Sequence, residues 1–178
     1  MSQAPSNQGW TTKVRLHELG KGAVTVRLEP DQAERAAIAK DLGLVSLPAL
    51  TAKLTVRPWM DGAEISGGFD AVVEQVCAVS LDNFEHPLSG DIDLRVVPAG
   101  SPQAPEPDGG EVDYDPDAPD PPDILDGDAI DLAAYVVEHL ALEIDPFARK
   151  PGVAFDYTPD SEPESPFAVL RKLKGEEP

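Results

Sequence analysis

Residues 50–57 carry the sequence Leu-Thr-Ala-Lys-Leu-Thr-Val-Arg, in which apolar and polar side chains alternate at every position. Leu50, Ala52, Leu54 and Val56 fall on one side of an extended chain, and the polar residues fall on the other. This period of two is typical of a β-strand with one buried and one exposed face. The stretch is the clearest strand signal in the chain, and the rest of the sheet is predicted outward from it.

The residues that follow continue the sheet. A turn over residues 59–62 leads to a stretch from 65 to 81 whose odd positions are mostly apolar, while Val72 and Val76 are apolar exceptions at even positions. Such a length predicts one long, bent strand with a bulge at Gly67 and Gly68. A turn over residues 82–87 then precedes another predicted strand over residues 88–96.

Two shorter strands are predicted before residue 50. Apolar and polar residues alternate over 14–16 and again over 24–28, on either side of Gly20-Lys21-Gly22. This arrangement predicts a hairpin with a tight glycine turn. Five or six strands joined by short turns predict an antiparallel sheet, and the sequence leaves open whether that sheet curls towards a barrel.

Two helices are expected to pack on this sheet, which makes the fold class α+β. Asp31 and Glu34 form a capping box and Gly43 stands where a C-terminal cap belongs, so a short helix is predicted over residues 31–43. A longer amphipathic helix is predicted over 129–146, with Asp128 as its N-cap and Pro146 as its stop. Its apolar face comprises residues at three- and four-residue spacing: Ile130, Ala133, Val137, Leu140, Ala141 and Ile144.

Length and charge define the organisation around these elements. The chain has 178 residues, which suits one domain, and 14 basic against 33 acidic residues give a net charge of −19. Residues 100–128 are acidic and proline-rich without a lysine or arginine, and such a segment is predicted to be a disordered linker. The predicted segments are a flexible N-terminus over 1–11, the sheet with its short helix over 12–99, the linker over 100–128, the helix of the same domain over 129–146, and an extended C-terminal segment over 147–178 with a motif at 165–174.

Several classes of protein are disfavoured by the composition. The apolar runs are too short to cross a bilayer, and the polar start over residues 1–8 is unlike a signal peptide, so a soluble, cytoplasmic protein without a membrane partner is expected. Cys77 is the single cysteine and lies at an apolar strand position, where a thiol acts as a small hydrophobe. It is not at metal-ligand spacing from a histidine, so neither a metal nor another cofactor is expected.

Catalytic motifs are also missing. The chain has no Gly-x-Ser-x-Gly elbow and no phosphate-binding glycine loop, and His139, near the end of the longer helix, is interpreted as a histidine at the solvent edge. The sequence therefore predicts a protein that is not an enzyme.

Binding is the remaining class of function, and two segments could provide it. The strand pair over 13–27 carries Lys13, Arg15, Lys21 and Arg27, a local basic patch that could contact RNA, although the net charge opposes nucleic-acid binding and DNA is not expected. The terminal motif has an apolar segment too short to fold alone, which would gain most by docking in a groove of this protein or of a partner. Its candidate partner-binding residues are Phe167, Val169, Leu170, Arg171 and Lys172. A third hypothesis is a small-ligand barrel with Trp59 and Phe69 near its mouth.

The order of these parts carries a family resemblance. The quoted segments are the capping-box helix at 30–36 with Leu-Gly-Leu at 42–44, the stretch 76–84 around Cys77, the helix from Ile-Asp-Leu at 130–132 to Asp-Pro at 145–146, and Ser-Pro-Phe-Ala-Val-Leu-Arg-Lys-Leu at 165–173. In these segments the chain resembles the YceD family, bacterial and plastid proteins described as large ribosomal RNA subunit accumulation proteins, and in particular its alphaproteobacterial branch. Many members carry Cys-x-x-Cys in the central strand, which suggests zinc, whereas here Ser80 stands at the second position.

The resemblance implies a non-enzymatic factor that supports accumulation or processing of large-subunit (23S) ribosomal RNA in ribosome biogenesis. Since the net charge is −19, the expected partner is a ribosomal protein or assembly factor with a basic surface, and contact with ribosomal RNA would be indirect. Direct RNA binding through the basic patch and ligand binding in a barrel are the alternatives.

Overall fold

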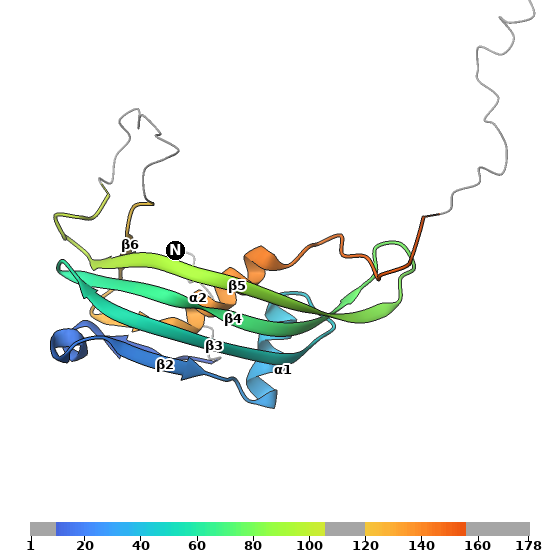
Figure 1. The fold of residues 1–178 in the computed structure, drawn as a ribbon, viewed down its shortest axis with the longest axis horizontal. Coiled ribbons are helices and arrows are strands. Elements are labelled where there is room, and N and C mark those ends of the chain that lie inside the picture. Colours follow the sequence, from blue (N-terminus) through green and yellow to red (C-terminus); the bar gives the residue numbers. More distant parts are fainter. Residues whose placement is uncertain (1–9, 106–119, 156–178) are drawn as a thin grey trace, which may run out of the picture.

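The computed structural model describes residues 10–105 and 120–155, in which strands and helices follow one another in a mixed α+β order (Figure 1). The first half of the chain contains β1 (Lys13–Arg15), the 3-10 helix η1 (Leu16–Lys21), β2 (Val24–Leu28), α1 (Gln32–Asp41) and β3 (Ser46–Trp59). The second half contains β4 (Gly62–Val76), β5 (Asn83–Pro98), β6 (Asp123–Leu125), β7 (Ala129–Asp131) and α2 (Leu132–Glu143). The predicted α+β class is confirmed.

A five-stranded sheet with the order β2-β3-β4-β5-β6 forms the body of the protein. Its pairs are antiparallel except for β5 and β6, which run parallel over three residue pairs. The long strands β3, β4 and β5 have 14, 15 and 16 residues, and they give the molecule its elongated form (Figure 1). The sheet is open, with β2 and β6 at its two edges, so it does not close into a barrel.

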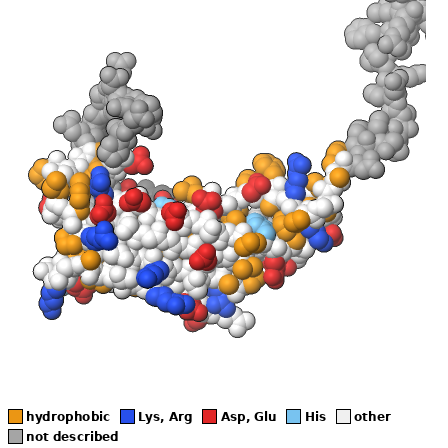
Figure 2. All heavy atoms as spheres, viewed as in Figure 1, with side chains coloured by type: hydrophobic (Ala, Val, Ile, Leu, Met, Phe, Trp, Pro, Cys, Tyr) orange, Lys and Arg blue, Asp and Glu red, His pale blue; other side chains and the backbone are white. Residues whose placement is uncertain are grey.

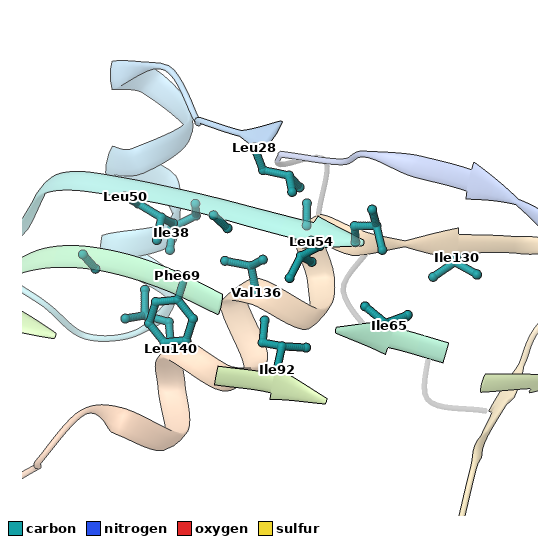
Figure 3. Close-up of a cluster of buried hydrophobic side chains, with 14 of the residues drawn as sticks. Leu28, Ile38, Leu50, Leu54, Ile65, Phe69, Ile92, Ile130, Val136 and Leu140 are labelled. Carbon is teal, nitrogen blue, oxygen red and sulfur yellow. The ribbon is translucent and has the colours of Figure 1, made fainter. Parts of the chain in front are cut away.

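The core lies between one face of this sheet and the two helices (Figure 3). Leu54 on β3 and Ile65 on β4 are fully buried, as are Val136 and Leu140 on α2. Burying each such aliphatic side chain contributes about 1.5–3 kcal/mol, so this interface dominates the stability of the fold. The alternation seen at residues 50–57 is explained by the core, because Leu50, Ala52, Leu54 and Val56 all face it.

The predicted hairpin over residues 14–28 is wrong. β1 pairs with β7 in a separate two-stranded sheet, where Val14 lies opposite Ile130, and β2 pairs with β3 instead. Between them the chain forms η1, which places Leu19 in the core. Two strands close in sequence would have been the default. In the structure β1 instead pairs with the segment before α2, and both Val14 and Leu19 are buried in this arrangement.

The predicted strand over 65–81 ends earlier than expected. β4 stops at Val76, a turn follows, and β5 begins at Asn83, so the expected turn over 82–87 is replaced by one over 77–82. Leu81 adopts a φ of 62°, which closes this turn. Val79 and Leu81 continue the alternation of apolar and polar residues, which is why the sequence predicts a longer strand. In the structure they belong to the turn, and Leu81 is 75% exposed.

The bulge predicted at Gly67 and Gly68 is also wrong. Both glycines continue the regular pairing on both sides, Gly67 with Leu54 and Ile92 and Gly68 with Lys53 and Asp91. The register shift between β3 and β4 instead lies between Ser46 and Ala49.

One helix follows its prediction and the other is shifted. α1 begins after Asp31, whose carboxylate accepts the Glu34 N–H at 2.8 Å, and Gly43 takes a φ of 68° after its end. α2 is capped by Asp131 instead of Asp128, because residues 129–131 form β7. Its buried face consequently differs from the predicted one: Leu132, Ala133, Val136 and Leu140 are buried, whereas Ala141 is exposed.

Part of the predicted disordered linker belongs to the fold. Within 100–128, β6 pairs with the end of β5, and Ser101 is buried with its hydroxyl donating to Asp61 Oδ1 at 2.8 Å. Residues 106–119 lie outside the described residues. Among residues 10–105 and 120–155, no helix has both the length and the apolar character needed to cross a membrane.

Candidate functional site: the open face of the sheet

The candidate interaction surface is the face of the sheet that α1 and α2 leave uncovered, which we call the open face (Figure 1). It carries the polar side chains that alternate with the core residues of β2 to β5. The strand register arranges these side chains in rows across the sheet. Along β3, β4 and β5 the rows are Ser46–Glu74–Glu85, Ala49–Val72–Pro87, Thr51–Asp70–Ser89, Lys53–Gly68–Asp91, Thr55–Ser66–Asp93 and Arg57–Glu64–Arg95.

Charge is divided across this face. Over the middle of the face, basic side chains lie on β2 and β3 and acidic ones on β4 and β5 (Figure 2), and Arg95 on β5 is an exception. On the basic side, Arg27 lies directly opposite Lys53, and Arg57 follows four residues further along β3. Like charges at opposing strand positions lower the stability of a sheet. The stability of the sheet therefore gives no reason for Arg27 and Lys53 to lie opposite one another. On the acidic side, Asp70, Asp91 and Asp93 are all exposed.

The four predicted RNA-contact residues are not brought onto one strand pair. Lys13 and Arg15 lie on β1 in the small sheet, Lys21 ends η1, and Arg27 alone lies in the main sheet. Two of them also have acidic neighbours: Arg15 lies 3.9 Å from Asp128 and Arg27 lies 3.9 Å from Glu29. The basic pair that the structure does form includes Lys53, which sequence reasoning missed because the register between β2 and β3 is not a local property.

An acidic edge lies beside β5 and β6. Asp93, Asp120 and Asp123 line a hollow of about 570 Å³ together with Arg95 and His139, and Asp126 and Glu138 line its neighbour. Burial and the carboxylate of Asp123 raise the pKa of Tyr135, so its phenol stays protonated. His139 donates from Nδ1 to the carbonyl of Tyr135 at 2.9 Å, one turn back along α2, and this bond gives the imidazole a structural partner.

Trp59 and Phe69, which the ligand-barrel hypothesis places near the mouth of a barrel, lie apart in the structure. Phe69 is 3% exposed and belongs to the core, whereas Trp59 lies on the open face with the Arg95 guanidinium 5.0 Å from its ring. Arg95 also lies 3.7 Å from Glu64. The two rings therefore lie on opposite faces of an open sheet, and the site expected in the ligand-barrel hypothesis does not form. The partner-binding candidates Phe167, Val169, Leu170, Arg171 and Lys172 lie outside the described residues.

Cys77 differs from its predicted role as a strand residue. It is fully buried in the turn between β4 and β5, and its Sγ accepts N–H bonds from Val79, Ser80 and Lys150, each at 3.4 Å. The Ser80 hydroxyl and these N–H groups lower the pKa of the thiol to about 6. Nowhere in residues 10–105 or 120–155 do three or more His, Cys, Asp or Glu side chains gather in a way that could hold a metal ion. The zinc suggested by the family's Cys-x-x-Cys pattern therefore does not fit these residues.

The fold and its surface define a small α+β protein with one open sheet face on which charge is divided. The family model described as "Large ribosomal RNA subunit accumulation protein YceD" matches residues 65–174, and the chain belongs to this family. No curated protein and no solved structure matches the chain. The match begins inside β4 and extends through α2 to the terminal motif.

Proposed function

We propose that this protein is a non-enzymatic factor that supports accumulation or processing of large-subunit ribosomal RNA, and that it acts through a protein partner. Membership of the YceD family supports the role in ribosomal RNA accumulation. The partner is proposed to be a ribosomal protein or an assembly factor with a basic surface. The observation that carries this choice is the acidic character of the molecule, at −19 overall, together with the acidic edge of the described fold.

Electrostatics favour a basic protein over RNA. A protein that binds RNA through phosphates gains affinity by replacing counterions with lysine and arginine, and a strongly acidic chain repels the phosphates at long range. The same field attracts a basic protein. Asp91, Asp93 and Asp123 extend this field along the β5 edge, next to the acidic segment over 100–128. We expect this combination to speed encounter with the partner and to make the association rate sensitive to salt.

The terminal motif would supply the apolar contact that charge alone cannot. Phe167, Val169 and Leu170 provide buried area in a complex, and Arg171 and Lys172 flank them. Charge then governs the association rate, while the apolar contact slows dissociation.

The test is recovery of partners from cell extract with the tagged full-length chain, at low and moderate salt, with and without nuclease. We expect a salt-sensitive ribosomal or assembly protein that nuclease does not remove. Deleting residues 165–174 should abolish this recovery while circular dichroism shows that the described fold is retained. Deleting residues 1–9 serves as the control for loss of a terminal segment. Precursor ribosomal RNA that disappears with nuclease would contradict the proposal.

Direct RNA binding is the second candidate, favoured by the Arg27–Lys53 pair on the open face. Reversing Arg27, Lys53 and Arg57 to glutamate should then weaken RNA binding and lower the slope of log K against log salt by about 2, since each single-strand phosphate contact contributes about 0.7. Reversing Lys13, Arg15 and Lys21 is the matched control, because these residues lie off the main sheet. Equal effects of the two triple variants would argue against an RNA site on the open face.

A further inference from the structure

The open face contains an apolar hollow where its polar pattern is interrupted. Ala49, Val72 and Pro87 lie side by side on β3, β4 and β5, each paired directly with the next. They line a hollow of about 360 Å³, which we call the Val72 hollow; Thr51, Asp70 and Ser89 line it from the adjacent row. Hydrophobic side chains are visible in this part of the face in Figure 2. Val72 was one of the two exceptions to the strand alternation, and the open face explains it as an outward apolar residue.

The surroundings of the hollow are acidic. Asp70 lines it directly, and Glu74 and Glu85 lie opposite one another in the row beyond Val72 and Pro87. Opposed like charges destabilise a strand pair, so a basic ligand over this row would relieve a real cost. The Ser46 hydroxyl donates to Glu74 Oε2 at 2.6 Å, but within the described residues none of these three carboxylates forms an ion pair. An occupant of this site should therefore combine apolar and basic side chains.

Residues 165–174 of the same chain have this combination. Phe167, Leu170 and Leu173 recur at helical spacing, and the segment contains Arg171, Lys172 and Lys174 without one acidic residue. In a chain with 33 acidic and 14 basic residues, a ten-residue segment of this composition is complementary to its own sheet.

The end of the described chain lies within reach of the hollow. After α2, the backbone runs along the turn between β4 and β5: the Ala78 N–H donates to the Ala148 carbonyl at 3.0 Å, and the Lys150 N–H donates to Cys77 Sγ. Cys77 is five residues from Val72 along the chain, about 17 Å at strand spacing. The twelve residues from Phe155 to Phe167 span about 40 Å when extended. The motif is therefore close enough along the chain to reach the Val72 hollow of the same molecule.

We propose that residues 165–174 dock in cis on the Val72 hollow, with Phe167 and Leu170 against Val72 and Pro87 and the basic side chains beside Asp70, Glu74 and Glu85. This docking holds the terminal motif on the protein's own surface until a partner takes it. The competition with a partner rests on the function proposed above, whereas the docking itself does not.

Disulfide trapping in the purified full-length chain tests the docking. Ser89→Cys on the rim of the hollow is combined with Ala168→Cys in the motif, and Thr25→Cys on β2 with Ala168→Cys is the matched control on the same face. Cys77 is buried and identical in both variants. We expect the Ser89 pair to form its intramolecular disulfide at least tenfold faster, with a smaller difference at high salt because the basic and acidic groups are screened.

A third substitution separates docking from chance encounter. Adding Val72→Lys to the Ser89 pair should bring its rate down to that of the Thr25 pair, because lysine removes the apolar contact and repels the basic motif. Circular dichroism should stay unchanged, since Val72 faces outward. Equal rates for the two pairs, or disulfides formed only between separate chains, would overturn the proposal. The experiment contains no partner, so it tests docking independently of the proposed function. Docking can fail while capture from extract still depends on the motif, and docking can occur while capture does not depend on it.

Discussion

Gly67 is one of the residues at which the main sheet has no room for a side chain. It has a φ of 151°, and a Cβ atom there would lie 2.1 Å from the carbonyl oxygen of Lys53 on the neighbouring strand. The close approach lets β3 and β4 stay paired while the Leu54 side chain fills the space beneath. The glycine is thus explained by a backbone contact, although it lies in regular pairing.

We expect Gly67→Ala to lower the free energy of unfolding by about 2–4 kcal/mol, since the backbone must shift to admit the methyl group. Gly20→Ala is the control, because a Cβ atom at Gly20 meets nothing within 4 Å and its φ lies outside the strained range. Urea unfolding of the two variants measures the difference. A loss at Gly67 no larger than that at Gly20 would show that the sheet can open here without cost.

Cys77 is the second residue whose role depends on its turn. The Ser80 hydroxyl and three backbone N–H groups surround its sulfur, and they lower the pKa of the thiol from 9.0 to about 6. Between these two pH values the folded protein binds fewer protons than the unfolded chain, so stability rises with pH. The contribution is complete above pH 9 and is lost as the pH falls through about 6.

The Cys77→Ala variant tests this linkage. We expect the stability advantage of the natural protein over the variant to grow between about pH 6 and about pH 9, because alanine has no thiolate to stabilise. Urea unfolding at several pH values across this window measures it. An advantage that stays constant with pH would mean that the buried thiol remains protonated.

At the scale of elements, two aspartates fix where the helices begin. Asp31 closes a capping box with Glu34, in which each side chain accepts the other residue's backbone N–H, at 2.8 and 2.7 Å. Asp131 has a wider role: its Oδ1 accepts from Ala133 N at 3.2 Å and from Thr12 N at 3.0 Å, so it joins α2 to the chain that enters β1. A single side chain therefore links the start of β1 to the start of α2 at one end of the small sheet.

We expect Asp31→Ala to cost about 1 kcal/mol and Asp131→Ala about 2 kcal/mol of unfolding free energy, because the second change leaves two partly buried N–H groups without their acceptor. Asp41→Ala, at the exposed end of α1, is the control and should have little effect. Thermal unfolding ranks the three variants. Equal losses for Asp31 and Asp131 would show that the bond to Thr12 adds nothing.

At the scale of the whole molecule, charge is the dominant property. The described fold separates basic and acidic side chains across one face, and the chain as a whole remains at −19. Six acidic residues without a basic one lie between residues 106 and 119: Glu106, Asp108, Glu111, Asp113, Asp115 and Asp117. Because long-range fields act before contact, this segment is expected to change the rate of association more than the rate of dissociation.

Neutralising these six residues to their amides should slow capture of the partner by about tenfold at low salt and leave the dissociation rate unchanged. The control variant neutralises Glu29 and Asp41, which lie just before α1 and at its end, away from β5 and β6. Stopped-flow association at several salt concentrations measures both. A tenfold slowing that persists at high salt would indicate direct contacts in place of steering.

The elements with a strong local signal were predictable, and their connections were not. The alternation at residues 50–57 and the capping box at Asp31 are short-range patterns, and both were confirmed. The hairpin over 14–28 and the turn over 82–87 were wrong, since each depended on which distant strand offers burial. The candidate site shows the same division: Val72 stood out in the sequence, but its neighbours Ala49 and Pro87 and the Arg27–Lys53 pair arise from register.

By itself, the sequence determined the α+β class, the faces of the central strands, the start of α1 and the family resemblance, because periodicity and capping are set by backbone geometry within a few residues. Only the tertiary structure decided that β1 pairs with β7, that the sheet stays open and that an acidic-rimmed hollow forms on its uncovered face. The physical reason is that strand pairing and register are chosen by the apolar area that distant segments bury together, and no local pattern encodes that sum.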